Sequence, residues 1–330
     1  MIAMNIAGLN ETRNATQPLA SRVRSSLEDA SEEPGAIARR KGDVPRAMVA
    51  AAKTHSATYF HQPCYVGRVW ACLDRAGIPI AWRHRVASTV CVPHGDPIRA
   101  FEDEIRAVDG AADIPYAIPN ILIEHVGADA PGLDARWRNG AGLAENAFTV
   151  ESFVDELAAL SRTCPAHYRR GMLATSPRAL AVLELAVSRS DWNAPPDRGT
   201  GRGFAMQAAR RSFLAMVAEV EVFGRDVHVG RVTCAMESGP GADLRAARQQ
   251  VEVGILMGLG SVRRGLDDNC ALPNESPAID VHFADGPCDP EGIAESAAAA
   301  VAPAIANAIF TATGNRIRAL PIIATPKEIS

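Results

Sequence analysis

Paired cysteines, a basic stripe and long apolar runs are all missing from this sequence of 330 residues. The seven cysteines are scattered without a CxxC pair, which argues against an intrinsic iron–sulfur or zinc site and indicates reduced thiols. The eight histidines show no HxxxH or HxH spacing, so no protein ligands for a metal are expected. A net charge of −4 and an aromatic content of 5% disfavour nucleic-acid binding.

Targeting and membrane signals are also missing. The first residues lack the basic-then-apolar order of a signal peptide. The most apolar stretch, 296–310, is too rich in alanine for a membrane span and is interrupted by Pro303. We therefore expect a cytoplasmic protein without a membrane span.

The composition that is present, 47% hydrophobic and 22% charged, is that of a globular protein. Residues 1–45 are polar, poor in aromatics and mixed in charge, which predicts a flexible N-terminal tail. The remainder, 46–330, alternates strands and helices irregularly, which favours an α+β domain over a doubly wound sheet. Two lobes, 46–145 and 146–330, are the alternative to a single domain.

Local patterns predict most elements of this domain. Residues 64–89 hold two alternating runs around a Gly-containing turn, which indicates a β-hairpin. Apolar periodicity predicts helices at 146–161, 177–190 and 242–262, and alternation predicts strands at 212–223, 226–236 and 278–285. Residues 91–140, rich in Pro and Gly, are expected to be ordered loop with short strands, and 199–206 to be a Gly-rich loop.

One acid stands out near the C-terminus. Glu295 lies at the start of a nearly uncharged, alanine-rich run, after Gly292 and Ala294. The exposed amides of a helix start favour an anion, so Glu295 can be a simple N-terminal charge partner. A carboxylate among small apolar residues is equally suited to act as a general base. Composition alone leaves these two interpretations even.

The order GIAES…VAPAIANAIFTATGNRIRALPI resembles the C-terminal signature of molybdenum hydroxylase large subunits. This is the xanthine dehydrogenase and aldehyde oxidase family, and the similarity is greatest to its branch of isoquinoline 1-oxidoreductase β-subunits. In that family a Gly-x-Gly-Glu segment supplies the catalytic glutamate, followed by a Pro-Ala-(Ile/Val)-x-Asn-Ala-Ile helix. Glu295 takes the glutamate position, and Pro303, Ala304, Asn307, Ala308 and Ile309 match the helix.

Three further segments resemble the same family, in the family's order. Residues 59–86 are similar to its hairpin, and 136–158 to its Trp-Arg-x-x-Gly segment with the following Glu-Ser-Phe-x-Asp-Glu helix. Residues 249–261 resemble its Gln-x-Glu-Gly-Gly cofactor helix. The resemblance implies the second molybdopterin-binding domain of this family in truncated form, the C-terminal half only.

The resemblance also implies the site. Glu295 is the catalytic base of a hydroxylation that takes its oxygen from water and acts on an aldehyde or an N-heterocycle. The molybdopterin cofactor, as a dinucleotide, contacts Gln250, Gly254, Ser296 and Gly292. The substrate contacts Arg138, Gly140 and Phe204, the last beside Gly201 and Gly203. Without the resemblance, Gln250 is a solvated helix residue, Arg138 a surface ion pair, and Gly201 to Phe204 a turn.

The implied partners follow from what the chain lacks. The cysteines cannot hold iron–sulfur clusters, so a separate small [2Fe-2S] subunit is expected to receive the electrons. The family's N-terminal half, with its glycine-rich loop, is expected on another chain. Two family glycines are replaced by Val253 and Ala294, and Val253 adds bulk where a backbone should approach the ligand. The alternative is a non-catalytic remnant or assembly partner that keeps the fold without the cofactor.

Overall fold

The computed structural model describes residues 48–56, 65–90, 105–129, 142–195, 197–209, 212–224, 226–239, 242–263, 276–286, 292–320 and 322. Its strands are β1 (Met48–Ser56), β2 (Tyr65–Leu73), β3 (Pro79–Val90), β4 (Ile121–Asp129), β5 (Thr200–Ala209), β6 (Ser212–Phe223), β7 (Asp226–Ser238), β8 (Ala278–Asp285) and β9 (Ala319–Leu320). Its helices are α4 (Leu143–Leu160), α5 (Pro165–Met172), α6 (Pro177–Arg189), α7 (Leu244–Arg263) and α8 (Ile293–Thr313). The expected tail, 1–45, lies outside the described residues.

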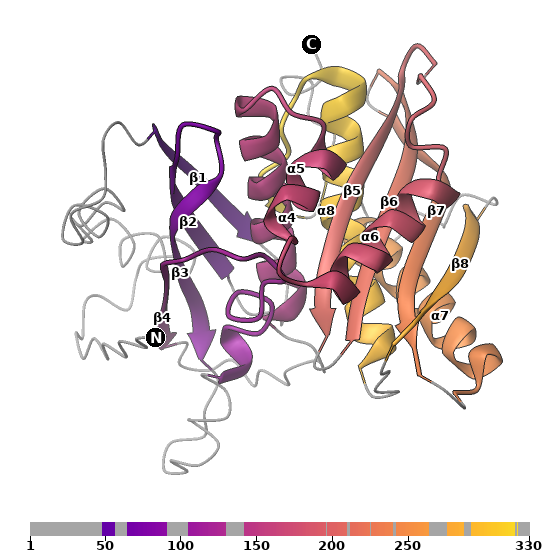
Figure 1. Ribbon diagram of the computed structural model, residues 1–330, viewed down its shortest axis with the longest axis horizontal. Coiled ribbons are helices and arrows are strands. Elements are labelled where there is room, and N and C mark those ends of the chain that lie inside the picture. Colours follow the sequence, from indigo (N-terminus) through magenta and orange to yellow (C-terminus); the bar gives the residue numbers. More distant parts are fainter. Residues whose placement is uncertain are drawn as a thin grey trace.

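The described strands form two sheets, and helices α4 and α5 lie between them (Figure 1). The first has the strand order β4-β3-β2-β1-β9, and the second has the order β5-β6-β7-β8. Both mix orientations, because β4 pairs with β3, and β8 with β7, in parallel. Helix α6 packs on one face of the second sheet. Helix α8 packs on β5 and β6 from the other face, and α7 lies next to α8. This arrangement confirms the α+β expectation.

The predicted hairpin is present as β2 and β3. Its turn is closed by the Asp74 carboxylate, which accepts hydrogen bonds from the backbone N–H groups of Ala76 (2.9 Å) and Ile78 (2.8 Å). Gly77 then takes a positive φ of 82°, a conformation that costs a glycine little. The sequence pattern therefore located this turn correctly.

Helix α8 is packed unusually closely on both sides. A Cβ atom on Gly203 of β5 would lie 2.1 Å from the carbonyl oxygen of Ala304. A Cβ atom on Gly254 of α7 would lie 2.2 Å from the carbonyl oxygen of Ala294. Glycines on the neighbouring elements, facing alanines on the helix, let the backbones meet with no side chain between them. The alanine-rich composition of α8 is thus explained by packing.

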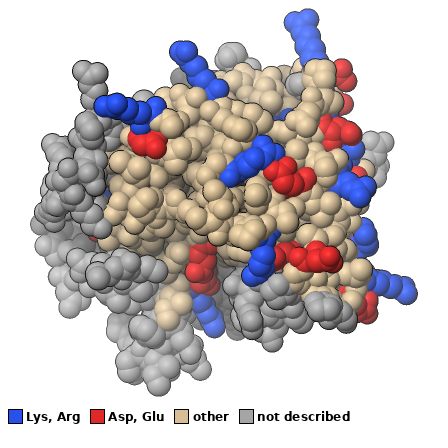
Figure 2. Space-filling model, in the orientation of Figure 1, with Lys and Arg blue, Asp and Glu red and all other residues tan. Residues whose placement is uncertain are grey.

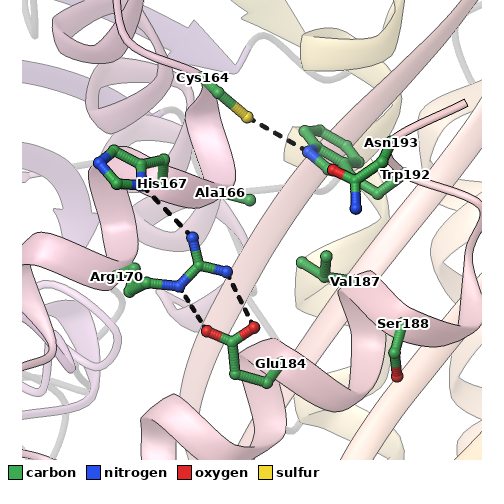
Figure 3. A pocket seen from close by; sticks show the side chains of 9 residues that line it. All are labelled: Cys164, Ala166, His167, Arg170, Glu184, Val187, Ser188, Trp192 and Asn193. Atoms are coloured by element: carbon green, nitrogen blue, oxygen red, sulfur yellow. Dashed lines mark hydrogen bonds and ion pairs between the residues drawn. The ribbon is translucent and has the colours of Figure 1, made fainter. Parts of the chain in front are cut away.

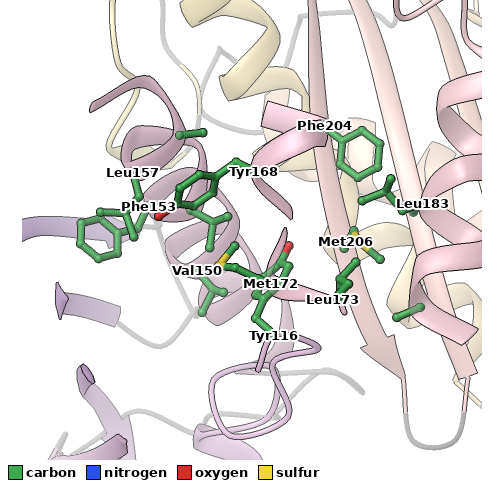
Figure 4. Close-up of a cluster of buried hydrophobic side chains, with 14 of the residues drawn as sticks. Tyr116, Val150, Phe153, Leu157, Tyr168, Met172, Leu173, Leu183, Phe204 and Met206 are labelled. Atoms are coloured by element: carbon green, nitrogen blue, oxygen red, sulfur yellow. The ribbon is translucent and has the colours of Figure 1, made fainter. Parts of the chain in front are cut away.

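Two apolar cores lie on the two faces of the second sheet. The first joins its α6 face to α4, α5 and the first sheet, and contains Phe153, Tyr168, Leu183, Phe204 and Met206 (Figure 4). The second lies under α7 and α8 and contains Met216, Val251, Ile255, Val301 and Ile305. Because α8 belongs to the second core, its first turn is held by the packing of the rest of the helix.

Two expectations about local structure were wrong. Residues 199–206 are not a loop, because most of this segment is strand β5, whose glycines at 201 and 203 face α8. Helix α5 was not expected at all. It spans only eight residues and is mostly polar, so it offers no apolar periodicity to read.

Helix α8 is also the one helix in the described part of the chain that is long and apolar enough to cross a membrane. The most apolar stretch of this helix is 72% buried within the molecule. Burial of that kind is equally found in the central helix of a folded core, so the finding is weak evidence for a span.

On the face seen in Figure 2, Lys and Arg side chains are interspersed with Asp and Glu.

Candidate active site at the start of helix α8

The candidate site begins where α8 begins. Gly292 is the N-cap, with a φ of 83° in the left-handed region, and no side chain caps the first turn. The Ser296 backbone N–H and hydroxyl both donate to the Gly292 carbonyl, at 3.0 and 2.7 Å. No described residue accepts a hydrogen bond from the first N–H groups of the helix, at 293–295. Such open amides, together with the helix dipole, favour an anionic group.

Glu295 lies in this first turn and is partly exposed. Among the described residues its carboxylate forms no hydrogen bond and no ion pair. This distinguishes it from the buried acids of the molecule, which are each held by arginine. A partly exposed, unengaged carboxylate is free to accept a proton from a bound molecule.

Helix α7 contributes the residues beside this turn. Gly254 faces Ala294, and Gly258 faces Ala298, so α7 and α8 run in the same direction. Gln250 precedes Gly254 by one turn and is exposed, at the same end of the helix pair as Glu295. Five of the predicted site residues thus belong to the first turn of α8 or to the neighbouring segment of α7: Gly292, Glu295 and Ser296, and Gln250 and Gly254.

Two of these five have structural explanations. The missing side chain of Gly254 is required by the Ala294 backbone, so helix packing accounts for this glycine. The Ser296 hydroxyl donates its proton to Gly292, so towards any ligand it can act only as an acceptor. Their contact with a cofactor stays a prediction.

The predicted substrate residues do not join this group. Phe204 is fully buried on the opposite face of β5 from Gly203. There its ring makes a T-shaped contact with the ring of Trp192, and the two ring centroids are 5.7 Å apart. In this position Phe204 has no exposed surface to offer a substrate. Gly201 and Gly203 face α8 and pack against its backbone. Arg138 and Gly140 lie outside the described residues.

The acids of the 151–156 segment, which carried part of the family resemblance, form a buried ion network instead. Glu151 is fully buried and is held by Arg169, whose Nη2 lies 2.9 Å from Oε2. Tyr116 donates its hydroxyl to Oε1 at 2.6 Å, and the Met206 N–H donates to Oε2 at 2.9 Å. These bonds join α4, α5 and β5 around one carboxylate.

The same network reaches the far half of α8. Asn307 donates its amide to the carbonyls of Phe204 (3.0 Å) and Glu151 (3.3 Å). Arg316 bonds Asp155 at 2.6 Å and Asn307 at 3.3 Å. The sequence signal for this network was the acid-rich helix together with the arginines of 316-RIR-318, but no pairing between them was expected.

Burial and charge act against each other in this network. Burial alone would lower the pKa of Arg169, but the neighbouring Glu151, Tyr116 and Asp155 outweigh it, and the pKa is raised. Burial, reinforced by the Glu151 charge, raises the pKa of Tyr116 well above its usual range. Both groups therefore keep one protonation state throughout the physiological range, which suits a structural role.

Solved structures show which fold this chain has. The aldehyde oxidoreductase of Desulfovibrio gigas matches with a TM-score of 0.63 and 14% identity, over 81% of this chain and 49% of that one. Quinoline 2-oxidoreductase from Pseudomonas putida 86 matches with a TM-score of 0.62 and 10% identity, over 81% of this chain and 61% of that one. The fold is that of the molybdopterin-binding domains of molybdenum hydroxylases.

Sequence comparison also finds similar curated proteins. The chain is 29% identical to the isoquinoline 1-oxidoreductase β-subunit of Brevundimonas diminuta over 231 residues, covering 63% of this chain and 29% of that protein. It is 31% identical to one subunit of the nicotinate dehydrogenase of Pseudomonas putida over 228 residues, covering 59% of this chain and 19% of that protein. No family model matches the chain.

These comparisons confirm the resemblance to the molybdenum hydroxylase large subunits. The chain spans less than a third of the length of these two curated relatives.

Proposed function

We propose that this chain is a subunit of a molybdopterin-dependent oxidoreductase that hydroxylates an aldehyde or an N-heterocycle, with water as the oxygen source. The observation that carries the proposal is the first turn of α8, where an unengaged Glu295 lies beside uncapped helix amides. The similarity to molybdenum hydroxylase subunits over about 60% of the chain supports it.

The described residues fit an anionic cofactor at this end of α8. The open N–H groups after Gly292 can bind a negatively charged group, and the exposed amide of Gln250 supplies a neutral donor. Gln250 and the backbone after Gly292 would therefore hold the molybdopterin group, which, when bound, supplies the two-electron oxidation.

Glu295 has the role of general base in this proposal. The backbone of Glu295 is held in place because α8 packs closely against β5 and α7, and no described residue pairs a cation with its carboxylate. It accepts the proton that the attacking oxygen must lose as the new C–O bond forms. General-base catalysis of this kind typically contributes roughly 10²–10⁴-fold in rate.

Two partners belong to the proposal. The relatives are much longer than this chain, so in this proposal the site is completed by the part of a large subunit that these 330 residues do not contain. A small [2Fe-2S] subunit receives the electrons, since the described cysteines, Cys72, Cys164 and Cys234, are dispersed, and no metal-binding group of His, Cys, Asp or Glu occurs among the described residues.

A non-catalytic role is the second candidate, and the surface of α7 favours it. Val253 is 52% exposed one position before Gly254, so a branched side chain stands on the cofactor helix where the family has glycine. A chain of this kind would keep the fold and assemble with partners without holding the cofactor.

Elemental analysis and one substitution separate the two candidates. We expect little molybdenum in the chain expressed alone, and near-stoichiometric molybdenum when it is co-expressed with a chain carrying the rest of the large subunit. In that complex Glu295→Gln should reduce turnover by roughly 10²–10⁴-fold and leave the metal content unchanged. The matched control is Glu221→Gln, an exposed acid on β6. Full turnover of Glu295→Gln, or a metal-free complex, would overturn the catalytic proposal.

A further inference from the structure

A pocket lies far from the first turn of α8, on the α6 side of the second sheet. It has a volume of about 540 Å³ and opens between α5 and α6 (Figure 3). Small-molecule sites typically have about 300–1,000 Å³, with apolar walls and a few polar groups. Nothing in the proposed oxidoreductase chemistry uses this pocket.

Its floor is apolar, and its wall includes one fixed aromatic ring. Ala166 and Val187 are buried beneath it. The Trp192 indole is held by two contacts: its Nε1–H donates to the Cys164 thiol at 3.3 Å, and its ring makes a T-shaped contact with the ring of Phe204. A ring that is already immobilised can stack on a planar ligand without a further loss of side-chain freedom.

The rim is polar but carries no net charge. Arg170 and Glu184 form a two-point ion pair, with Nη2 and Oε2 2.8 Å apart. Their hydrogen bond raises the pKa of Arg170 and lowers that of Glu184, so both are ionised and neutralise each other. An anion entering the pocket would meet Glu184, and a cation would meet Arg170. The lining therefore favours an uncharged ligand.

Hydrogen-bonding groups for such a ligand are present. Arg170 Nη1 lies 3.4 Å from His167 Nδ1, so the Nε2 atom of the same ring faces away from the guanidinium (Figure 3). The Ser188 hydroxyl donates to Leu185, which leaves its oxygen as an acceptor. The rim thus offers an imidazole nitrogen and a hydroxyl oxygen beside an aromatic wall.

We infer that the pocket between α5 and α6 binds a planar, uncharged aromatic amide or a similar ring with one donor and one acceptor. The ring stacks on Trp192 over Val187, and its polar edge meets His167 and Ser188. Cys164, which is exposed at the wall, becomes covered when the ligand is bound.

Alkylation of Cys164 reports occupancy. The full chain is treated with iodoacetamide, and modification of the Cys164 peptide is followed by mass spectrometry. Benzamide is the probe, benzoate tests the charge requirement, and cyclohexanecarboxamide tests planarity. We expect benzamide at about 20 mM to slow alkylation at least fivefold, and the other two compounds to slow it less than twofold.

Two variants on α6 make the test specific. Ser188→Phe, at the exposed rim, should fill the pocket and abolish protection by benzamide. Ala181→Phe, exposed on the same helix and outside the pocket lining, should leave protection intact. Equal effects of all three compounds, no protection by benzamide, or protection that survives Ser188→Phe would each overturn the inference. None of these outcomes depends on molybdenum or turnover, so the oxidoreductase proposal is tested separately.

Discussion

The two ends of helix α8 are built in opposite ways. The last turns carry Asn307 and lie next to Arg316, where nearly every polar atom is paired within the described chain. The first turn carries Glu295 behind an uncapped Gly292, with its carboxylate unengaged by the described residues. Paired and buried groups maintain a shape, whereas open and ionisable groups can act on something else. The same helix therefore serves as an anchor at one end and as a candidate site at the other.

The family resemblance rested on sequence motifs at both ends. At the anchored end, the 151–156 segment and Asn307 are explained by the ion network and by bonds to backbone carbonyls. At the open end, Glu295 and Gln250 have no such internal explanation. Similar motifs thus divide into those that hold the fold and those left for chemistry. The following predictions test this division.

The largest expected effect comes from the centre of the anchor. Arg169→Met leaves the fully buried Glu151 without its cation, which typically costs about 3–5 kcal/mol. Urea unfolding followed by circular dichroism measures the free energy of unfolding. The control is Arg318→Met, which removes an ion pair with Glu156 that is partly exposed and worth about 0–1 kcal/mol. Equal losses for the two variants would contradict the central place of Arg169.

The pH dependence of stability tests a buried group with few partners. Burial lowers the pKa of His84 to about 3, and Tyr65 is its one side-chain partner among the described residues, at 3.3 Å. The unfolded chain binds a proton near pH 6.5 that the folded chain does not bind. Stability should therefore fall as the pH drops from about 6.5 towards 3, by about 1.4 kcal/mol per pH unit for this group.

The measurement is the free energy of unfolding of the parent and of His84→Gln at several pH values. The free energy of unfolding of the variant should depend less steeply on pH, by the contribution of one proton. The pH dependence that remains includes that of His125, whose pKa burial lowers to about 4. An unchanged slope in His84→Gln would show that His84 is not buried neutral.

A single methyl group should disrupt the close packing of α8 against β5. Gly203→Ala places a Cβ atom 2.1 Å from the Ala304 carbonyl oxygen, which forces α8 away from β5. Overpacking of this kind typically costs about 1–3 kcal/mol. The matched control is Gly230→Ala on β7, where a Cβ atom has no neighbour within 4 Å. If the melting temperatures of both variants match that of the parent, the close approach of helix and strand is wrong.

The smallest effect on stability is expected at the open end. Glu295→Gln removes only a favourable charge at a helix start, worth roughly 0.3–1 kcal/mol. Thermal unfolding should therefore show a small decrease in melting temperature. A loss as large as that of Arg169→Met would mean that Glu295 is part of the anchor, and the contrast between the two ends of α8 would disappear.

Elements with strong local patterns could be predicted from the sequence. The β2–β3 hairpin, α4, α6, α7 and the β6–β7 pair were all expected near their observed positions. In each case apolar periodicity and turn-forming residues act within a short segment, so the local sequence is sufficient to predict the element. The candidate base was also located from sequence, because Glu295 combines a helix-start position with a family motif.

What depended on contacts between distant segments was decided only by the tertiary structure. The glycines of β5 were read as a loop because their packing partner, α8, lies about a hundred residues away. Phe204 was expected at a substrate and lies in the core, because the side of the sheet to which a residue points is set by strand pairing. The partners of Glu151 and Asp155 likewise come from α5 and from residue 316. Sequence patterns specify local conformation and the kind of chemistry, whereas the pairing of buried groups follows from how the elements pack.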